Sequence, residues 1–185
     1  MPPKFGTSGL RGLVTELTDA VVADHVRAFL ATCPIGSGLY VGRDLRPSSP
    51  AIAQAVVRAA RGAGVVTTDC GAVPTPALAL AATGAGAAAV MITGSHIPAD
   101  RNGLKFYVPE GEITKAHETA IKAALGGLSA ASATEGPAPR SNTGAGAAYV
   151  ARYLRAYGAE ALAGLRIGVY AHSAVGRDLI TETLS

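Results

Sequence analysis

The chain has 185 residues, of which 49% are hydrophobic and 16% are charged, a composition typical of a globular protein rather than a disordered one. Its net charge of +3 is spread without basic blocks, which argues against a nucleic-acid partner. Residues 1–9 contain no apolar signal core, and no apolar run reaches the roughly 18 residues of a membrane span. Cys33 and Cys70 are isolated and lack metal-finger spacing, which favours reduced core cysteines. We therefore expect a cytoplasmic protein without a membrane partner.

The first 125 residues alternate between helical and strand-like patterns. Thr18 is a candidate N-cap for the first helix, whose apolar residues recur at helical spacing. Helices are predicted over residues 19–32, 48–61, 76–83 and 114–125, and strands over residues 38–42, 65–70, 87–93 and 104–108. The strand over 87–93 is apolar on both faces, which predicts a central strand covered on both sides. The alternation predicts an α/β fold with a mixed, mostly parallel sheet covered by helices on both faces.

The composition changes after residue 125. Residues 126–146 are mostly small and polar and include two prolines, which indicates a linker or a long surface segment. The elements predicted beyond it are a helix, a strand and a helix, over residues 147–157, 167–170 and 177–184. One strand and two helices cannot bury their own faces. We therefore predict a first domain over residues 1–140 and, in residues 141–185, the end of the linker and the truncated start of a second α/β domain. Its exposed apolar residues could lead the chain to self-associate.

The richest group of polar residues follows the buried strand 87–93, in the stretch TGSHIPADRNGLKFY. Open α/β sheets place their functional sites at the carboxyl ends of such strands. His96, Arg101 and Lys105 lie within ten residues of Ser95. A hydroxyl close to several cationic groups suits phosphoryl transfer, because catalysis there depends mainly on positioning and charge neutralisation. The same stretch also fits a polar loop whose Ser and His only satisfy backbone groups.

A glycine-rich segment near the N-terminus, FGTSGLRG, places Thr7, Ser8 and Arg11 among three glycines. Successive backbone N–H groups in such a turn can hold an anion. An N-terminal hairpin turn without a ligand explains the segment equally well.

A second glycine-containing segment, GRDLRPSSP, follows a predicted strand and opens a predicted helix. This position brings Arg43 and Arg46 close to the free N–H groups of a helix N-terminus, which favour anions. A structural ion pair between Arg43 and Asp44 is the alternative.

Taken together, these segments resemble the α-D-phosphohexomutase family, which includes phosphomannomutases, phosphoglucomutases and phosphoglucosamine mutases. The family's serine loop reads approximately T-A-S-H-N-P followed by N-G-x-K, and here it stands as TGSHIP followed by NGLK. FGTSGLRG, GRDLRPSS and VPTPAL match three further family segments, in the family's order. Gly94 stands where Ala is common, which is harmless at a turn, and Ile97 stands where Asn is common.

The resemblance implies a role for each matching residue. Ser95 would carry the transferable phosphate, and its phosphoryl oxygen would bind Mg²⁺. His96 and Lys105 would assist proton transfer, and Arg11 would support the phosphoryl group. The residues expected to bind substrate or phosphate are Thr7, Ser8, Arg43, Arg101 and Asn102. The implied reaction moves a phosphate between the C1 and C6 oxygens of a hexose phosphate through a hexose 1,6-bisphosphate.

Other family motifs are absent from the sequence. The magnesium loop D-G-D-x-D-R, the sugar loop G-E-x-S-G and the phosphate loop R-x-S-x-T-x-P do not occur, so the remaining Mg²⁺ ligands are missing from this chain. The resemblance thus covers the family's first domain and the opening of its second. We expect a fragment of a phosphohexomutase that is inactive in isolation, with mannose the favoured sugar and glucose the near alternative. A stand-alone sugar-phosphate or anion-binding module without catalysis is the alternative.

Overall fold

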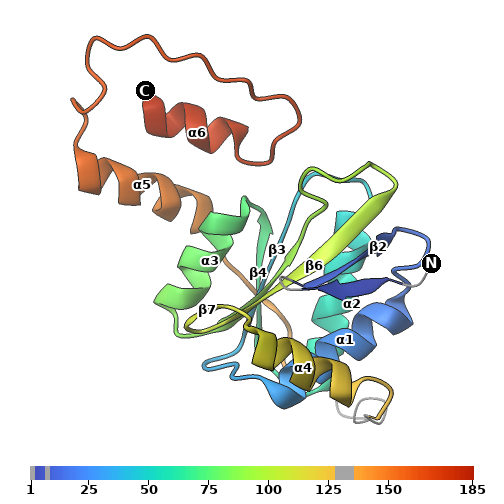
Figure 1. Ribbon diagram of the computed structural model, residues 1–185. Coiled ribbons are helices and arrows are strands. Elements are labelled where there is room, and N and C mark those ends of the chain that lie inside the picture. The colour runs from blue at the N-terminus through green and yellow to red at the C-terminus, as the bar shows by residue number, and fades with distance from the viewer. Residues whose placement is uncertain (1–2, 7–8, 128–135) are drawn as a thin grey trace.

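A computed structural model describes residues 3–6, 9–127 and 136–185 (Figure 1). The described strands form one sheet in the order β1-β2-β6-β5-β3-β4-β8, with β7 paired to β6. The strands are β1 (Lys4–Gly6), β2 (Gly9–Leu13), β3 (Leu39–Arg43), β4 (Thr67–Ala72), β5 (Ala88–Ile92), β6 (Arg101–Val108), β7 (Gly111–Glu112) and β8 (Arg140–Ser141). The helices are α1 (Asp19–Thr32), α2 (Ser49–Gly62), α3 (Thr75–Gly84), α4 (Lys115–Ala124), α5 (Ala145–Tyr157) and α6 (Arg177–Leu184). Within the described ranges, no helix is both long enough and apolar enough to cross a membrane.

The predicted mixed α/β sheet is confirmed, with parallel pairing limited to one part of it. Strands β5, β3, β4 and β8 run parallel to one another. Strand β6 runs antiparallel to β5, β2 and β7, and β1 runs antiparallel to β2. The connection from β5 to β6 spans only residues 93–100. This is too short for the crossover that a parallel pair requires, so β6 returns antiparallel.

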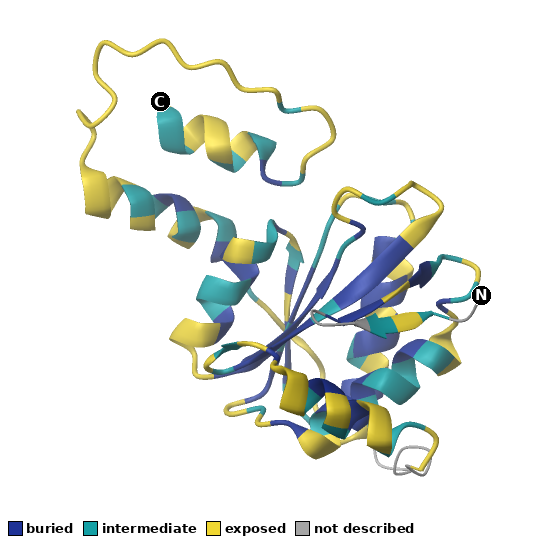
Figure 2. Cartoon of the chain, viewed as in Figure 1, coloured by how far each residue is buried: buried dark blue, intermediate teal, exposed yellow. Residues whose placement is uncertain are grey.

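Helices cover both faces of the sheet, as predicted. Helices α1, α2 and α4 form one layer, α3 covers the other face, and α5 contacts α3 (Figure 1). Strand β5 shows why both layers are needed, because all its residues are buried (Figure 2). Ala88, Val90 and Ile92 belong to the core beneath α1 and α2, while Ala89 and Met91 belong to the core beneath α3. The expectation of a central strand covered on both sides is confirmed.

Helix α1 begins and ends where the sequence predicts. The Thr18 hydroxyl accepts the Val21 N–H at 3.4 Å, which satisfies one of the donors left free at a helix start. Val22, Val26 and Phe29 recur at helical spacing and are fully buried. The cap and the spacing of the apolar residues therefore both predict the helix that is observed, Asp19–Thr32.

The predicted linker is attached to the sheet at β8. Arg140 pairs with Thr68 of β4, and the Asn142 N–H donates to the carbonyl of Asp69 at 2.8 Å. The predicted boundary between residues 140 and 141 therefore falls inside a strand of this sheet. The division of the chain into two domains stays a prediction.

The two cysteines lie in the core without a disulfide, as predicted. Burial raises the pKa of the Cys33 thiol, and it raises the pKa of Cys70 to about 11 with further help from the neighbouring Asp69 carboxylate. Both thiols therefore stay protonated and poorly nucleophilic at neutral pH.

The C-terminal segment, residues 145–185, packs much less tightly than the sheet and helices α1–α4. Helix α5 contacts α3, and α6 contacts α5. The strand predicted over residues 167–170 is wrong: these residues form no strand, and Ile167 and Tyr170 are 47% and 89% exposed. A strand needs a neighbour to accept its backbone hydrogen bonds, and in the described residues none lies beside this stretch.

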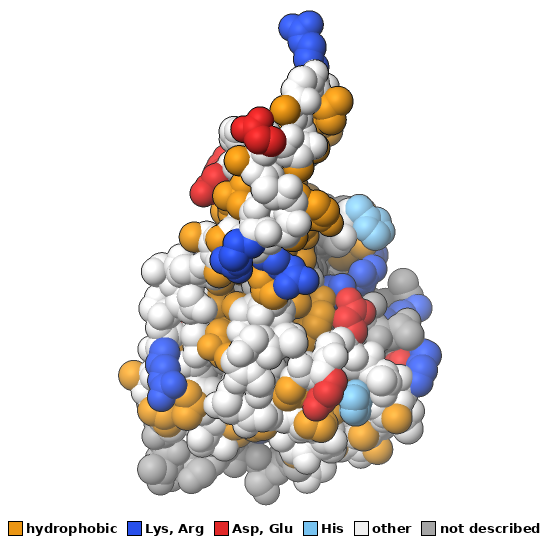
Figure 3. Space-filling view, turned by 90° about the vertical axis from the view of Figure 1, so that its left-hand side faces the viewer, with side chains coloured by type: hydrophobic (Ala, Val, Ile, Leu, Met, Phe, Trp, Pro, Cys, Tyr) orange, Lys and Arg blue, Asp and Glu red, His pale blue; other side chains and the backbone are white. Residues whose placement is uncertain are grey.

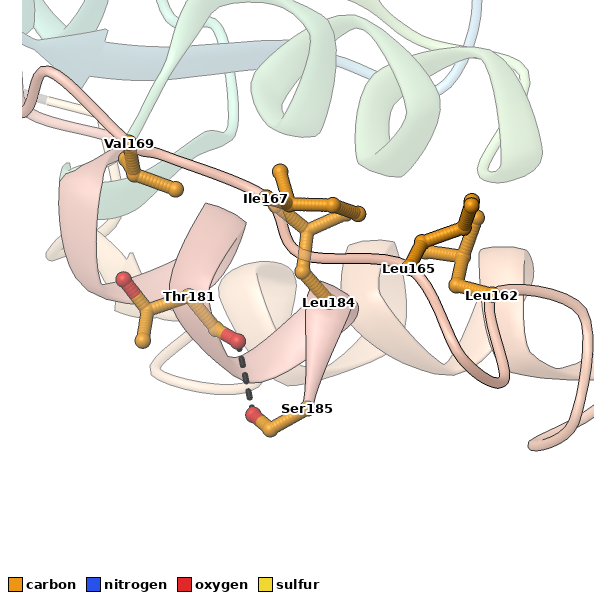
Figure 4. A pocket seen from close by; sticks show the side chains of 7 residues that line it. All are labelled: Leu162, Leu165, Ile167, Val169, Thr181, Leu184 and Ser185. Atoms are coloured by element: carbon orange, nitrogen blue, oxygen red, sulfur yellow. Dashed lines mark hydrogen bonds between the residues drawn. The ribbon is translucent and has the colours of Figure 1, made fainter.

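Apolar side chains of this segment reach the surface. Figure 3 shows hydrophobic side chains exposed along the narrow upper part of the molecule. The stretch before α6 forms a groove of about 220 Å³ against the end of that helix (Figure 4). It is lined mainly by Leu162, Leu165, Ile167, Val169 and Leu184. Self-association through these residues stays a prediction.

Candidate active site

The serine loop, residues 93–100, leaves the sheet at the carboxyl end of β5. This is the edge at which the parallel strands β3 and β4 also end. Ser95 is exposed and has a φ of 48°, a left-handed conformation that costs a non-glycine residue about 1–2 kcal/mol. Its N–H donates to Thr93 Oγ1 at 2.9 Å, and its hydroxyl lies 3.2 Å from His96 Nδ1. The loop therefore presents the Ser95 hydroxyl to solvent with an imidazole beside it.

Arg46 holds the serine loop from within. Its Nη1 donates to the carbonyls of Pro98 at 2.6 Å and Arg101 at 2.9 Å. Its Nη2 donates to the carbonyls of Ile97 at 2.6 Å and Ser95 at 3.3 Å. The sequence places Arg46 near a helix N-terminus as a candidate anion contact, but the structure directs its guanidinium to loop carbonyls instead.

Asp44 connects Arg46 to the start of the serine loop. Its Oδ1 accepts the Arg46 N–H at 3.0 Å and the Ser49 hydroxyl at 2.5 Å, and its Oδ2 accepts the Gly94 N–H at 2.9 Å. The Arg46 Nε lies 3.6 Å from Asp44 Oδ2. The alternative of an ion pair between Arg43 and Asp44 is therefore wrong, because the carboxylate pairs with Arg46.

Gly94 provides the space that the guanidinium occupies. A Cβ added to Gly94 would lie 2.0 Å from Arg46 Nε and 2.1 Å from Cζ, both impossible distances. Glycine at this position therefore leaves room for the Arg46 guanidinium where it lies in this chain. The sequence could not show this, because the two residues are far apart along the chain.

Asn102 is internal rather than a ligand for phosphate. Its side chain is fully buried. Its Nδ2 donates to the hydroxyls of Ser48 at 2.8 Å and Ser49 at 2.9 Å, and its Oδ1 accepts the Gly103 N–H at 2.8 Å. The predicted binding role is replaced by a structural one, which connects β6 to the start of α2.

Arg11 lies close to the serine loop. It is exposed on β2, opposite Gly103 of β6. A Cβ added to Gly103 would lie 3.1 Å from Arg11 Cγ and 3.3 Å from the carbonyl oxygen of Thr93, so the stem of Arg11 runs beside the residue that opens the loop. Lys105 is two residues further along β6 and shares this face of the sheet, because strand side chains alternate.

Lys105 contacts Glu112 across the turn between β6 and β7. Its Nζ lies 3.2 Å from Glu112 Oε1 and 5.7 Å from the centre of the Tyr107 ring. Burial lowers the pKa of Lys105, but attraction to Tyr107 and Glu112 outweighs burial and raises the pKa overall. The ammonium therefore stays protonated at neutral pH. Sequence reasoning missed Glu112, although Pro109 and Gly111 signal the tight turn that brings it back.

Four predicted site residues remain: Arg43, Arg101, Thr7 and Ser8. Arg43 ends β3 and Arg101 begins β6, and neither side chain forms a hydrogen bond or ion pair with any described residue. Arg11 is likewise unpaired within the described chain, and all three arginines lie on strands near the carboxyl end of β5. Thr7 and Ser8 lie outside the described residues. The strands that flank them form the hairpin given as the alternative for this segment.

The comparisons with known proteins identify the family. Residues 2–131 match the family model of the phosphoglucomutase/phosphomannomutase α/β/α domain I. The chain belongs to this family. The recognition that rests on the serine loop and its companion segments is thereby confirmed.

The relatives that match this chain are longer than it is. A phosphomannomutase from Sinorhizobium fredii is 50% identical and matches the whole chain with 41% of its own length. A phosphomannomutase from Salmonella muenchen is 42% identical over 95% of the chain and 37% of its own length. A solved structure from Thermus thermophilus superposes with a TM-score of 0.76, at 28% identity, over 98% of this chain and 44% of that one. The chain thus spans about two fifths of the length of these curated relatives.

The part of the chain that the structure describes offers no complete magnesium site. It contains no cluster of three or more His, Cys, Asp or Glu side chains placed to hold a metal ion. Asp44, the carboxylate bonded to the serine loop, already accepts from Arg46, Ser49 and Gly94. Mg²⁺ needs several oxygen ligands. Coordination by a phosphorylated Ser95 stays a prediction.

Proposed function

We propose that this chain is the phosphoserine-bearing part of a phosphomannomutase, in which Ser95 donates and recovers the transferred phosphoryl group. The observation that carries the proposal is the presentation of Ser95. A braced loop holds this residue in a left-handed conformation with its hydroxyl exposed, 3.2 Å from His96 Nδ1. Arg11, Arg43 and Arg101 form no ion pair with any described residue, and they lie at the same end of the sheet, where they could neutralise phosphate charge.

Each half of the proposed reaction breaks one bond from phosphorus to oxygen and forms another. In the first half, a sugar hydroxyl attacks phosphoserine, the bond to Ser95 Oγ breaks, and a hexose bisphosphate forms. The serine oxygen gains a proton and the sugar hydroxyl loses one. His96 is close enough to the Ser95 hydroxyl to supply that proton and to recover it in the second half. Lys105, kept protonated by its neighbours, would act through its charge.

The sugar is proposed to be mannose. The relatives that match nearly the whole chain, at 50% and 42% identity, are phosphomannomutases. A probable phosphoglucosamine mutase from Methanothermobacter thermautotrophicus is 45% identical, but over 113 residues and 60% of the chain. The longer matches therefore favour mannose phosphate over glucosamine phosphate.

The first test is the site of phosphorylation in the full-length protein. After incubation with mannose 1,6-bisphosphate, trypsin should release a peptide of residues 62–101 that carries one phosphate. Ser95 is the only serine in that peptide, so fragmentation can separate it from the threonines. The Ser95→Ala variant should gain no phosphate. Phosphate on Thr93, Ser48 or Ser49 would contradict the assignment.

The second measurement is turnover. Mannose 1-phosphate should give a higher kcat/KM than glucose 1-phosphate or glucosamine 1-phosphate, and a preference for either of those would overturn the choice of sugar. The 185-residue chain alone should show no turnover, because correct orientation of a substrate is worth about 7–11 kcal/mol and this chain lacks the family's sugar and phosphate loops. Sugar-phosphate binding by the full-length protein without phosphorylation or turnover would instead support an anion-binding module.

A further inference from the structure

We propose that Glu112 is a positioning residue that holds the Lys105 ammonium away from the serine loop until a phosphate group displaces it. This inference rests on the proposed function, in which Ser95 carries the phosphoryl group and Lys105 acts on it through its charge. Glu112 and the substrate phosphate therefore compete for one cation.

The hairpin between β6 and β7 fixes the place of Glu112. Tyr107 is paired with Glu112, and the turn that joins the two strands consists only of residues 109–110. Gly111 follows this turn with a φ of 139°, a conformation that glycine adopts without strain. Opposed residues of an antiparallel pair point to the same face, and so do residues two apart along a strand. Lys105, Tyr107 and Glu112 therefore share one face of the sheet.

One carboxylate oxygen of Glu112 contacts both other side chains. Glu112 Oε1 lies 3.2 Å from Lys105 Nζ and accepts the Tyr107 hydroxyl at 3.4 Å. The ammonium also lies 5.7 Å from the centre of the Tyr107 ring, within the range of a cation–π contact. Tyr107 is buried and fixes the position of the group, whereas the side chains of Glu112 and Lys105 are 56% and 26% exposed. The ion pair is therefore held in place but accessible to a competing anion.

These contacts draw Lys105 away from the serine loop. The loop begins at Thr93, whose N–H donates to the carbonyl of Gly103 at 3.0 Å. Tyr107 lies four residues beyond Gly103 on β6, which is about 13 Å at the usual rise of a strand. Both partners of the ammonium, Tyr107 and Glu112, are therefore on the side of Lys105 opposite to the loop. Because a lysine stem is flexible, the ammonium can turn to a phosphate, which offers more negative charge than one carboxylate.

The main test compares Glu112→Gln with the matched control Glu110→Gln in the full-length protein. Glu110 is exposed in the same turn and its side chain bonds no described residue, so its substitution removes a negative charge without freeing Lys105. Glu112→Gln should lower KM for mannose 1-phosphate by about threefold, as expected when a partly exposed ion pair no longer has to open, with kcat unchanged. Glu110→Gln should change neither value. An unchanged or raised KM in Glu112→Gln, or an equal fall in both variants, would overturn the proposal.

A double-mutant cycle with Lys105→Met tests whether Glu112 acts through Lys105. Methionine keeps an unbranched side chain but removes the charge. The cycle is measured as the Kd of mannose 1-phosphate by calorimetry, because Lys105→Met should slow turnover. In the Lys105→Met background, Glu112→Gln should leave Kd unchanged. A threefold fall in that background as well would mean that Glu112 repels the substrate directly, which would overturn the positioning role.

Chemical labelling of Lys105 separates this proposal from the proposed function. Acetic anhydride reacts with the uncharged amine, and mass spectrometry of the substrate-free protein gives the rate at which Lys105 is acetylated. This rate should be about threefold higher in Glu112→Gln than in wild type or Glu110→Gln, because a nearby carboxylate stabilises the ammonium. Equal rates would overturn the claim that Glu112 holds Lys105. Absence of phosphate on wild-type Ser95 would overturn the proposed function, whereas the labelling rates would still decide whether Glu112 holds Lys105.

Discussion

The α/β body, made of the sheet and helices α1–α4, differs sharply from the C-terminal segment of residues 145–185. Helix α2 buries seven residues against the sheet, including Ile52 and Val56. Helix α6 has an apolar face of its own but buries none of its residues. Of the exposed large hydrophobic residues in the described chain, all but Leu45 lie in the C-terminal segment, which is largely exposed in Figure 2.

The contrast shows that an apolar face becomes buried only where a second surface meets it. Leu104 on β6 is fully buried between strands and helices, while Leu165 before α6 is 65% exposed. The two side chains are chemically identical. Their different surroundings allow the contrast to be tested with matched pairs of substitutions in the 185-residue chain.

The largest difference is expected between Leu104→Ala and Leu165→Ala. Truncating the buried Leu104 should lower the free energy of unfolding by about 2–5 kcal/mol, because it leaves a cavity in the core. The same truncation at Leu165 should change it by less than about 0.5 kcal/mol. Urea unfolding followed by far-ultraviolet circular dichroism gives both values. Similar losses would mean that the C-terminal segment is packed as tightly as the body.

A smaller difference is expected between two threonine substitutions. The Thr114 hydroxyl accepts the His117 N–H, and His117 Nδ1 accepts the Thr114 N–H at 3.1 Å, which together cap the start of α4. Thr114→Ala should therefore lower the unfolding free energy by about 1 kcal/mol. Thr181→Ala, on the exposed α6, should have almost no effect on the same urea transition. A greater loss at Thr181 would contradict the comparison.

The smallest effect is expected for Glu118 and depends on pH. Hydrogen bonds from Lys122 and Lys115 lower the pKa of this carboxyl group. A lowered pKa in the folded state stabilises the protein above the pKa of the unfolded chain, and this contribution is lost as the pH falls through the folded value. Glu118→Gln should therefore lower Tm at pH 7 but not at pH 3. The control is Glu182→Gln on α6, which should leave Tm unchanged at pH 7 and at pH 3. A loss of Tm in Glu118→Gln that grows toward pH 3 would contradict the predicted direction of the pH dependence.

Local signals in the sequence predicted much of the α/β body. Thr18 and Thr114 mark the starts of α1 and α4 because a hydroxyl caps an N–H only three residues away. The apolar run of β5 predicts a covered central strand, because every side chain on either face must be buried. The serine loop was also located correctly at the end of that strand, since its glycine, proline and polar residues signal a turn there.

Only the tertiary structure decided which of these residues touch. Asn102 was expected to bind phosphate, yet its amide is buried against Ser48 and Ser49, which precede it by more than fifty residues. The Arg46 guanidinium donates to carbonyls of the serine loop across a similar separation. The strand predicted over residues 167–170 fails for the same reason. Helix caps and periodic apolar faces depend on neighbours along the chain. Strand pairing, side-chain hydrogen bonds between distant residues and burial depend on a second segment that the fold must bring into place.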